Sequence, residues 1–477
     1  MNELLGALMF PLAIAGIVLS GAPAFVVLLG VALVFAALGV GLGAFDASLL
    51  RALPLRLVGL LEHDLLQALA LYALVGALLH RLELAEIWLK CAGRWLAPTR
   101  AGEELAAIGL GALTAPMNGS VGASLGMLRH TAAPRLAAAG IAPARATALV
   151  AVASTLGVIV PPSLVLLLLG DALMRAHTEA LLLAPAAGVR IINNQDVIRA
   201  VLLPGALVLA VVLLITALAA WRQRRPVEAT LAEAITRQEW GLSIALTLAV
   251  PLLLGGVAAG HVFAVEAAAL AGGVLLVYGV ASGELRGAWA AMLDEAMRLT
   301  GLVFGLLIGA TTFTLVLRGF GTDAGLTRLL GSLGAGPYLA LGIVLGLLLA
   351  CAFVLDAFEL IFLVVPLVMP PLLARVGDPA WVAVLTLLVL QIGFLLPPLG
   401  YAVLMARGAS TAPAPLRAVA AALAPYLAGL LLVLAAVLAW PGLTHLGRNE
   451  AASAPALSES EVENLLRQRG GRPDAPP

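Results

Sequence analysis

The chain begins with a stretch, Leu4 to Phe45, in which no residue carries a charge. It is about twice as long as the roughly 20 apolar residues with which one helix crosses a bilayer. Gly21-Ala22-Pro23 lies in its middle, so we predict two membrane helices joined by a tight turn. A signal peptide would start with basic residues, whereas the only early charge is that of Glu3. The missing Lys and Arg also favour a non-cytoplasmic N-terminus.

The composition extends this prediction to the whole chain. Of 477 residues, 62% are hydrophobic and 11% are charged, against roughly 45–50% and about 25% in soluble domains. This excludes a soluble enzyme, a nucleic-acid binder and a disordered chain. The formal net charge is zero, so no nucleic-acid partner is expected. The apolar runs do not alternate as the strands of an outer-membrane barrel do, so we predict an all-α, polytopic membrane protein surrounded by lipid.

Apolar runs and charged stretches divide the chain into parts. We predict N-terminal scaffold helices (1–45), a first repeat (46–221), a polar loop (222–240), further scaffold helices (241–281), a second repeat (282–445) and a polar, mostly disordered tail (446–477). Three arginines at the start of the loop predict that it is cytoplasmic.

Each repeat is expected to begin in the same way. Charged amphipathic stretches at 46–62 and 282–298 are typical of arms that lie in the membrane interface. The short apolar segments after them, 64–80 and 299–318, contain Gly76 and Gly309, and we predict that each is a re-entrant hairpin.

Two Pro-Pro steps indicate an internal duplication. Leu156 to Ser163 and Ile392 to Leu399 share the pattern apolar, Gly, three apolar, Pro-Pro, with Pro161 and Pro397 offset by 236 residues. Such a step removes two backbone donors and frees carbonyl groups, which lipid tolerates only where they face protein or a watery cavity. Interrupted spans at matched positions are typical of transporter sites, where carbonyls hold Na⁺ and helix N-termini hold carboxylates. The alternative is a simple proline kink in each helix.

Charged residues inside the spans are the next candidates. Asp356 and Glu359 lie three residues apart, on one face of a helix, in an apolar run. A buried charge costs about 2.5–3.5 kcal/mol on insertion scales, so two on one face predict cation coordination or a polar gate. A salt bridge to an arm arginine is the alternative. Asn118 and Ser120 are the matching polar pair of the first repeat.

Other polar residues keep two interpretations. Thr311 and Thr312 either bind Na⁺ or bond to their own helix backbone. Asp171, Glu266 and Arg318 lie near predicted helix ends, where a solvated or paired role competes with substrate contact. Cys91 and Cys351 are expected to be small core residues, and no P-loop, paired metal-binding His, Cys-x-x-Cys or catalytic triad predicts an enzyme.

Together these motifs resemble the large membrane subunit of TRAP (tripartite ATP-independent periplasmic) transporters, in the branch labelled mannitol/chloroaromatic. The motifs are Asn118 to Ser124, Ser154 to Ser163, Ile308 to Phe313, Val354 to Glu359 and Gln391 to Gly400. The resemblance implies an elevator-type, inverted-repeat importer with two re-entrant hairpins in the bacterial inner membrane. It implies Na⁺-coupled symport of an organic acid (carboxylate), a separate small membrane subunit and a periplasmic solute-binding protein. It implies no cofactor besides Na⁺ as the coupling ion.

The resulting site prediction joins both repeats. The substrate and ion candidates are Gly76, Asn118, Gly119, Ser120, Ser154, Thr155, Pro161, Pro162, Ser163, Gly309, Thr311, Thr312, Asp356, Glu359, Gln391, Pro397 and Pro398. The Na⁺ candidates among them are Asn118, Ser120, Thr311 and Asp356.

The chain departs from the family pattern in places. Ile392, Gly393 and Leu396 stand where the second Pro-Pro region of the family carries hydroxyls, and Ala70 replaces a proline. The lost hydroxyls concern one sodium site of the second repeat. A stand-alone ion-coupled antiporter or anion transporter of the same fold is an alternative, because the fold alone does not separate the two functions. A membrane-embedded enzyme or assembly scaffold is a further rival, for which the sequence offers no catalytic constellation.

Overall fold

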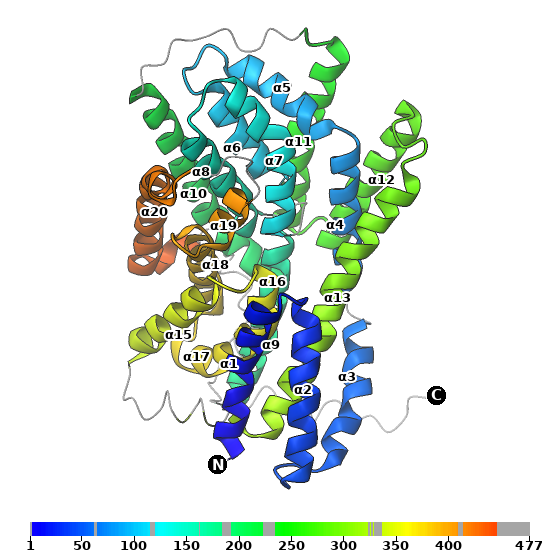
Figure 1. The fold of residues 1–477 in the computed structure, drawn as a ribbon, viewed down its shortest axis with the longest axis vertical. Coiled ribbons are helices and arrows are strands. Elements are labelled where there is room, and N and C mark those ends of the chain that lie inside the picture. The colour runs from blue at the N-terminus through cyan, green and yellow to red at the C-terminus, as the bar shows by residue number, and fades with distance from the viewer. Residues whose placement is uncertain are drawn as a thin grey trace, which may run out of the picture.

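The computed structural model describes residues 2–61, 64–114, 120–161, 163–183, 192–222, 234–322, 325, 328, 336–408 and 414–445. All regular structure within these ranges is helical (Figure 1). Eight of the described helices are long and apolar enough to cross a membrane, or nine if one bent pair counts as a span. The prediction of an all-α polytopic protein is confirmed.

The first half contains α1 to α10. Their bounds are α1 (Asn2–Ser20), α2 (Ala24–Gly41), the 3-10 turn η1 (Ala47–Arg51), α3 (Ala52–Leu61), α4 (Asp64–Arg81), α5 (Leu84–Leu96), α6 (Gly102–Thr114), α7 (Val121–Ala138), α8 (Pro143–Thr155), the 3-10 turn η2 (Leu156–Val158), α9 (Leu164–Leu183) and α10 (Asn194–Arg222).

The second half contains α11 to α20. Their bounds are α11 (Arg237–Ala259), α12 (Ala264–Ser282), α13 (Trp289–Gly319), α15 (Pro337–Cys351), α16 (Ala357–Glu359), the π-helical turn η3 (Leu360–Val364), α17 (Val365–Val376), α18 (Pro379–Leu395), α19 (Tyr401–Gly408), α20 (Leu416–Ala439) and the 3-10 turn η4 (Pro441–Thr444).

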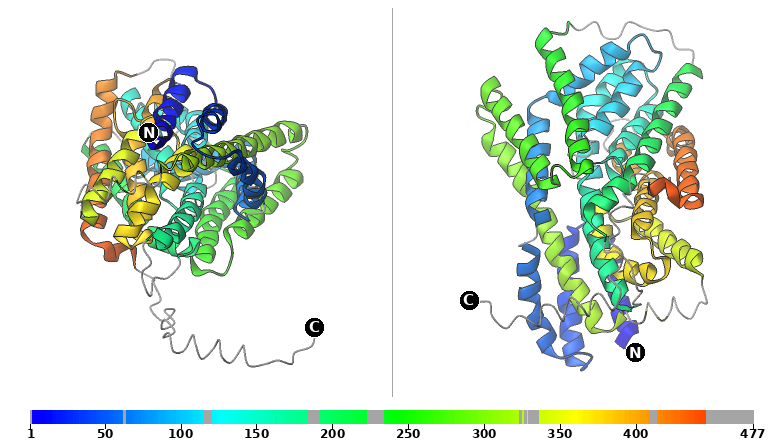
Figure 2. Two further views of the ribbon diagram at one scale, coloured as in Figure 1. Left: turned by 90° about the horizontal axis from the view of Figure 1, so that it is seen from below. Right: turned by 180° about the vertical axis from the view of Figure 1, so that it is seen from behind.

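The helix contacts follow the duplication. Helix α2 packs against α13 while α12 packs against α4, and α6 packs against α8 as α15 does against α18. Helices α10 and α20 pack against each other at one edge. Figure 1 shows α1, α2 and α3 gathered at one end of the molecule, α5, α11 and α12 toward the other, and α13 running between them. Figure 2 shows the same division from behind.

Helices α8 and α18 form the centre of the molecule. Every residue of α18 is buried, and α8 is buried from Ala148 to Thr155. A helix that is apolar on all faces belongs in a protein or membrane interior. Each begins with a proline in its first turn, where the missing backbone N–H removes no hydrogen bond, and Asp378 caps α18 by accepting from the Trp381 N–H at 3.2 Å.

The predicted hairpin at 299–318 is wrong, because α13 continues through it without a break. Its two glycines serve close packing instead of a turn. A Cβ at Gly305 would lie 3.1 Å from the ring of Phe25, and one at Gly309 would lie 3.0 Å from the Phe25 carbonyl oxygen. The absence of side chains at these positions lets α13 approach α2. The arm predicted at 282–298 is, from Trp289 onward, the beginning of this same helix.

The predicted hairpin at 64–80 is also wrong. Asp64–Arg81 is one helix, α4, and the chain turns only afterwards, with a bend of 63° between Ala68–Arg81 and Leu84–Leu96. Glu83 marks this corner with a left-handed φ of 50°. Helices α5 and α6 then pack along each other, so the helix pair of the first repeat lies one segment later than the sequence indicated.

Candidate functional site

The two central helices end at matched breaks. Helix α8 stops at Thr155 and α18 stops at Leu395, and Pro161 and Pro397 follow these ends. Thr155 and Gln391 are both fully buried and are themselves offset by 236 residues. Pro162 lies outside the described residues. Residues that are 236 positions apart in the sequence therefore occupy equivalent positions at the ends of α8 and α18.

Gln391 is the least satisfied polar side chain at these breaks. Neither its amide oxygen nor its amide nitrogen has a hydrogen-bond partner among the described residues. The polar residues at the equivalent break of the first repeat do have hydrogen-bond partners. Ser154 donates to the Ala151 carbonyl at 2.8 Å, and Thr155 donates to the Val152 carbonyl at 2.9 Å. A buried amide without partners costs about 1–3 kcal/mol, so Gln391 is positioned to gain from a ligand.

Ser120 and Asp356 begin equivalent helices. Ser120 caps α7 and accepts from the Ala123 N–H at 3.1 Å, and Asp356 is the residue before α16, again at an offset of 236. Asn118 and Gly119, also predicted for the site, lie outside the described residues.

The two acidic residues occupy a helix start and not the middle of a continuous helix. Asp356 precedes the first turn, and the Glu359 carboxylate accepts from the Asp356 N–H at 3.1 Å. Asp356 Oδ1 is buried and has no hydrogen-bond partner among the described residues. Within those residues, neither carboxylate forms an ion pair. A π-helical turn, η3, follows directly, and such turns occur frequently at functional sites.

Tyr401 joins this group and was not predicted from the sequence. Its hydroxyl lies 3.2 Å from the position of a Cβ at Gly122, in the first turn of α7. It is close enough to Asp356 and Glu359 to interact electrostatically with both. The signal that could have found it is its place directly after the second Pro-Pro break.

Other predicted residues divide between structural and open roles. Thr312 donates to the Ile308 carbonyl at 2.8 Å, so its backbone interpretation is confirmed. Ser163 lies at the start of α9, where the Leu166 N–H reaches its hydroxyl at 3.4 Å. Gly76 is buried within α4. Pro398 lies in the turn between α18 and α19.

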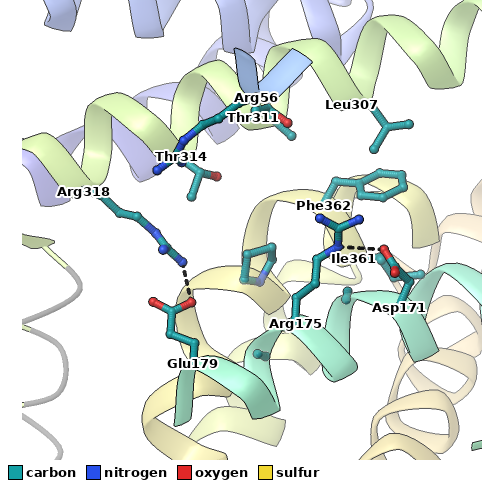
Figure 3. A pocket seen from close by; sticks show the side chains of 14 residues that line it. Arg56, Asp171, Arg175, Glu179, Leu307, Thr311, Thr314, Arg318, Ile361 and Phe362 are labelled. Carbon is teal, nitrogen blue, oxygen red and sulfur yellow. Dashed lines mark hydrogen bonds and ion pairs between the residues drawn. The ribbon is translucent and has the colours of Figure 1, made fainter. Parts of the chain in front are cut away.

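A cavity of about 350 Å³ is lined in part by Ile361 and Phe362 of η3, the turn that follows Glu359 (Figure 3). Helix α9 contributes Asp171, Arg175 and Glu179, α13 contributes Thr311 and Arg318, and Arg56 reaches it from α3. One ion pair lines the cavity along α9, from Arg175 Nε to Asp171 Oδ2 at 3.0 Å. Another joins α13 to α9, from Arg318 Nη2 to Glu179 Oε2 at 2.7 Å. The paired interpretation is therefore confirmed for Asp171 and Arg318.

Glu266 and the cysteines have structural roles. The Glu266 carboxylate accepts from the Phe263 N–H at 2.8 Å, at the start of α12. Cys91 and Cys351 are free and buried, as expected. No group of three or more His, Cys, Asp or Glu that could hold a metal ion occurs in the described part of the chain.

Comparisons with known proteins found likenesses in family, sequence and fold. The family described as "Tripartite ATP-independent periplasmic transporter, DctM component" matches residues 10–443. A curated relative, the C4-dicarboxylate TRAP transporter large permease protein DctM of Pseudomonas aeruginosa, is 24% identical over 367 residues, which cover 75% of this chain and 80% of the relative. The crystal structure of the YdaH transporter of Alcanivorax borkumensis matches with a TM-score of 0.58 and 19% identity, covering 92% of this chain and 98% of that one. At that identity the likeness concerns the fold alone.

Proposed function

Because the chain belongs to the DctM family of tripartite ATP-independent periplasmic transporter components, we propose that it imports a small organic acid by symport with Na⁺. It would act as the large permease subunit in a bacterial inner membrane. The proposed solute class is a dicarboxylate of about the size of succinate, because the Pseudomonas aeruginosa relative is named a C4-dicarboxylate permease.

The unpaired Asp356 carboxylate oxygen at a helix start carries the Na⁺ part of this proposal. It is a hard, anionic oxygen without a partner among the described residues. In transporter sites, carbonyls freed at helix breaks and side-chain oxygens coordinate Na⁺ together. Ser120 supplies the equivalent position in the first repeat.

Gln391 offers a side-chain oxygen at the second break, where the hydroxyls of the family pattern are missing. Ile392, Gly393 and Leu396 offer no side-chain oxygen, but the buried amide of Gln391 lies in the same segment without a partner among the described residues. We infer that the amide oxygen replaces a hydroxyl at this break.

Partners complete the proposal. A small membrane subunit would cover part of the exposed apolar surface, on which Leu252, Val274 and Val277 are 76%, 68% and 67% exposed, and lipid would cover the rest. A periplasmic solute-binding protein would deliver the organic acid.

Reconstitution tests this function. The chain, its small subunit and its binding protein are placed in proteoliposomes, and uptake of labelled succinate is measured with and without an inward Na⁺ gradient. We expect uptake that needs both the gradient and the binding protein. Asp356→Ala should sharply raise the Na⁺ concentration needed, whereas Asp294→Asn, on the exposed first turns of α13, should not. Uptake without Na⁺ would contradict symport, and uptake without the binding protein would support the stand-alone carrier.

A further inference from the structure

The cavity in Figure 3 separates two groups of helices. Arg56 of α3 and the residues of α13 line one side, while α9 and the η3–α17 segment line the other. Its volume of about 350 Å³ falls within the range of about 300–1,000 Å³ that small-molecule pockets have. It is therefore large enough for a small organic acid.

The lining carries an excess of positive charge. Three arginines face two carboxylates. Arg175 and Arg318 each pair with one carboxylate, at 3.0 and 2.7 Å. Arg56 makes no hydrogen bond or ion pair with the residues that the structure describes. One guanidinium therefore has no counter-charge there, and it carries several N–H donors in a planar fork that suits a carboxylate.

Two hydroxyls line the same cavity as this guanidinium. They belong to Thr311 and Thr314, which are one turn apart on α13 (Figure 3). Thr300 and Thr312 of the same helix donate to the carbonyl four residues earlier, at 2.7 and 2.8 Å. Neither Thr311 nor Thr314 makes such a bond to any described residue. Their hydroxyls remain available to a ligand in the cavity.

We propose that this cavity is a carboxylate-binding vestibule in which Arg56, Thr311 and Thr314 hold one carboxylate of the organic acid. Leu307 and Phe362 line the same cavity and would contact the carbon chain. Thr311 then serves the anion and not Na⁺, because the excess guanidinium charge repels a cation. The inference rests on the proposed transport of organic acids and adds a place where the solute is held.

Direct binding to the purified full chain tests the vestibule. The protein is placed in phosphatidylcholine nanodiscs and titrated with succinate by calorimetry. Arg56→Gln, and separately Thr311→Val with Thr314→Val, should weaken succinate binding about tenfold or more, since a hydrogen bond to a charged group contributes about 1.5–3 kcal/mol. Arg51→Gln is the matched control, because Arg51 is an exposed arginine just before α3 that does not line the cavity. Unchanged affinity in Arg56→Gln, or an equal loss in Arg51→Gln, would overturn the proposal.

Two further arms separate the sources of the anion and the two proposals. Succinate binding is also measured in phosphatidylglycerol nanodiscs. If this lipid abolishes binding to the wild type but leaves the affinity of Arg56→Gln unchanged, the Arg56 guanidinium binds a lipid headgroup and the vestibule is refuted. In proteoliposomes, wild-type uptake with an apparent KM that Arg56→Gln leaves unchanged refutes the vestibule and leaves the transport function standing. No succinate uptake by the wild type, with binding intact, refutes the transport function instead.

Discussion

A buried ion pair near α8 belongs to a polar cluster that joins the two repeats. Glu104 of α6 is 2% exposed and Arg145 of α8 is 9% exposed, and they form a salt bridge. Arg145 Nη2 also lies 3.4 Å from the Thr216 carbonyl of α10, and the Thr216 hydroxyl shares a 2.9 Å hydrogen bond with the Tyr426 hydroxyl of α20. One polar cluster therefore joins four helices.

Glu104→Leu should destabilise the protein strongly. It leaves the Arg145 guanidinium buried without its carboxylate, and breaking a buried pair in this way costs about 3–5 kcal/mol. For a chain of this size that corresponds to a fall in Tm of about 3–5 °C, because the entropy of unfolding grows with chain length. Adding Arg145→Met should recover most of the loss, because replacing both charges with apolar side chains is often neutral.

Thermal unfolding in detergent, followed by the fluorescence of the seven tryptophans, measures these shifts. The control is Asp294→Asn, which removes the exposed pair between Asp294 and Arg298, whose side chains are 62% and 79% exposed. Such a pair contributes at most about 1 kcal/mol, so its Tm should hardly change. A wild-type Tm in Glu104→Leu, or a double variant as unstable as the single one, would refute the reasoning.

Three further predictions concern packing, the contact between α5 and α11, and topology. Gly111→Ala should lower the Tm, because its Cβ would meet a backbone carbonyl oxygen of α8 at 2.6 Å, whereas Gly126→Ala, which meets nothing within 4 Å, should not. Lys90→Glu should loosen α5 from α11 by breaking the 2.8 Å pair with Glu239, and adding Glu239→Lys should recover only part of the lost Tm, because Glu239 also accepts from the Thr236 N–H in the cap of α11. A cysteine at Gln223, outside the described residues, should resist an impermeant thiol reagent applied to intact cells, and ready labelling would invert the topology.

The duplication could be predicted from the sequence, whereas the ion pairs that its repeated glutamates form could not. The offset of 236 residues was visible in Pro161 and Pro397, and the same offset relates Glu3 to Glu239. In the structure these two glutamates pair with Arg328 and with Lys90, respectively. The sequence does not indicate which basic residue pairs with each glutamate, because the partners are far apart in the chain and meet only when the helices are packed.

The hairpins were misplaced because glycine has two uses inside an apolar run. Gly305 and Gly309 fit a turn or a close helix contact equally well in the sequence. The choice depends on Phe25, more than 270 residues earlier, which occupies the space that a Cβ would need. No pattern within the segment reports such a distant neighbour.

Some candidate site residues can be proposed from the sequence and others cannot. Gln391 and Asp356 interrupt apolar runs, and the free-energy cost of burying a polar group there marks them as candidates. Tyr401 has an apolar ring and attracts no notice in a membrane helix. Arg56 and Thr314 belong to separate segments, and only the fold places them at one cavity.

Because α13 is one continuous helix, the cross-link that should stop transport is one between α13 and α9. Residues 299–318 belong with α2 and α4, against which α13 packs, so they are expected to stay with the scaffold. If α9 and the broken helices move as one body, the cavity is a sliding boundary. Arg318→Cys with Glu179→Cys, joined across it by a bifunctional thiol reagent, should abolish uptake until the link is reduced. Val75→Cys with Gly272→Cys is the control within the scaffold, where a Cβ at Gly272 would lie 3.5 Å from Val75. Full uptake with the first link in place would mean that α9 does not move against α13, and a local gate would then be the better mechanism.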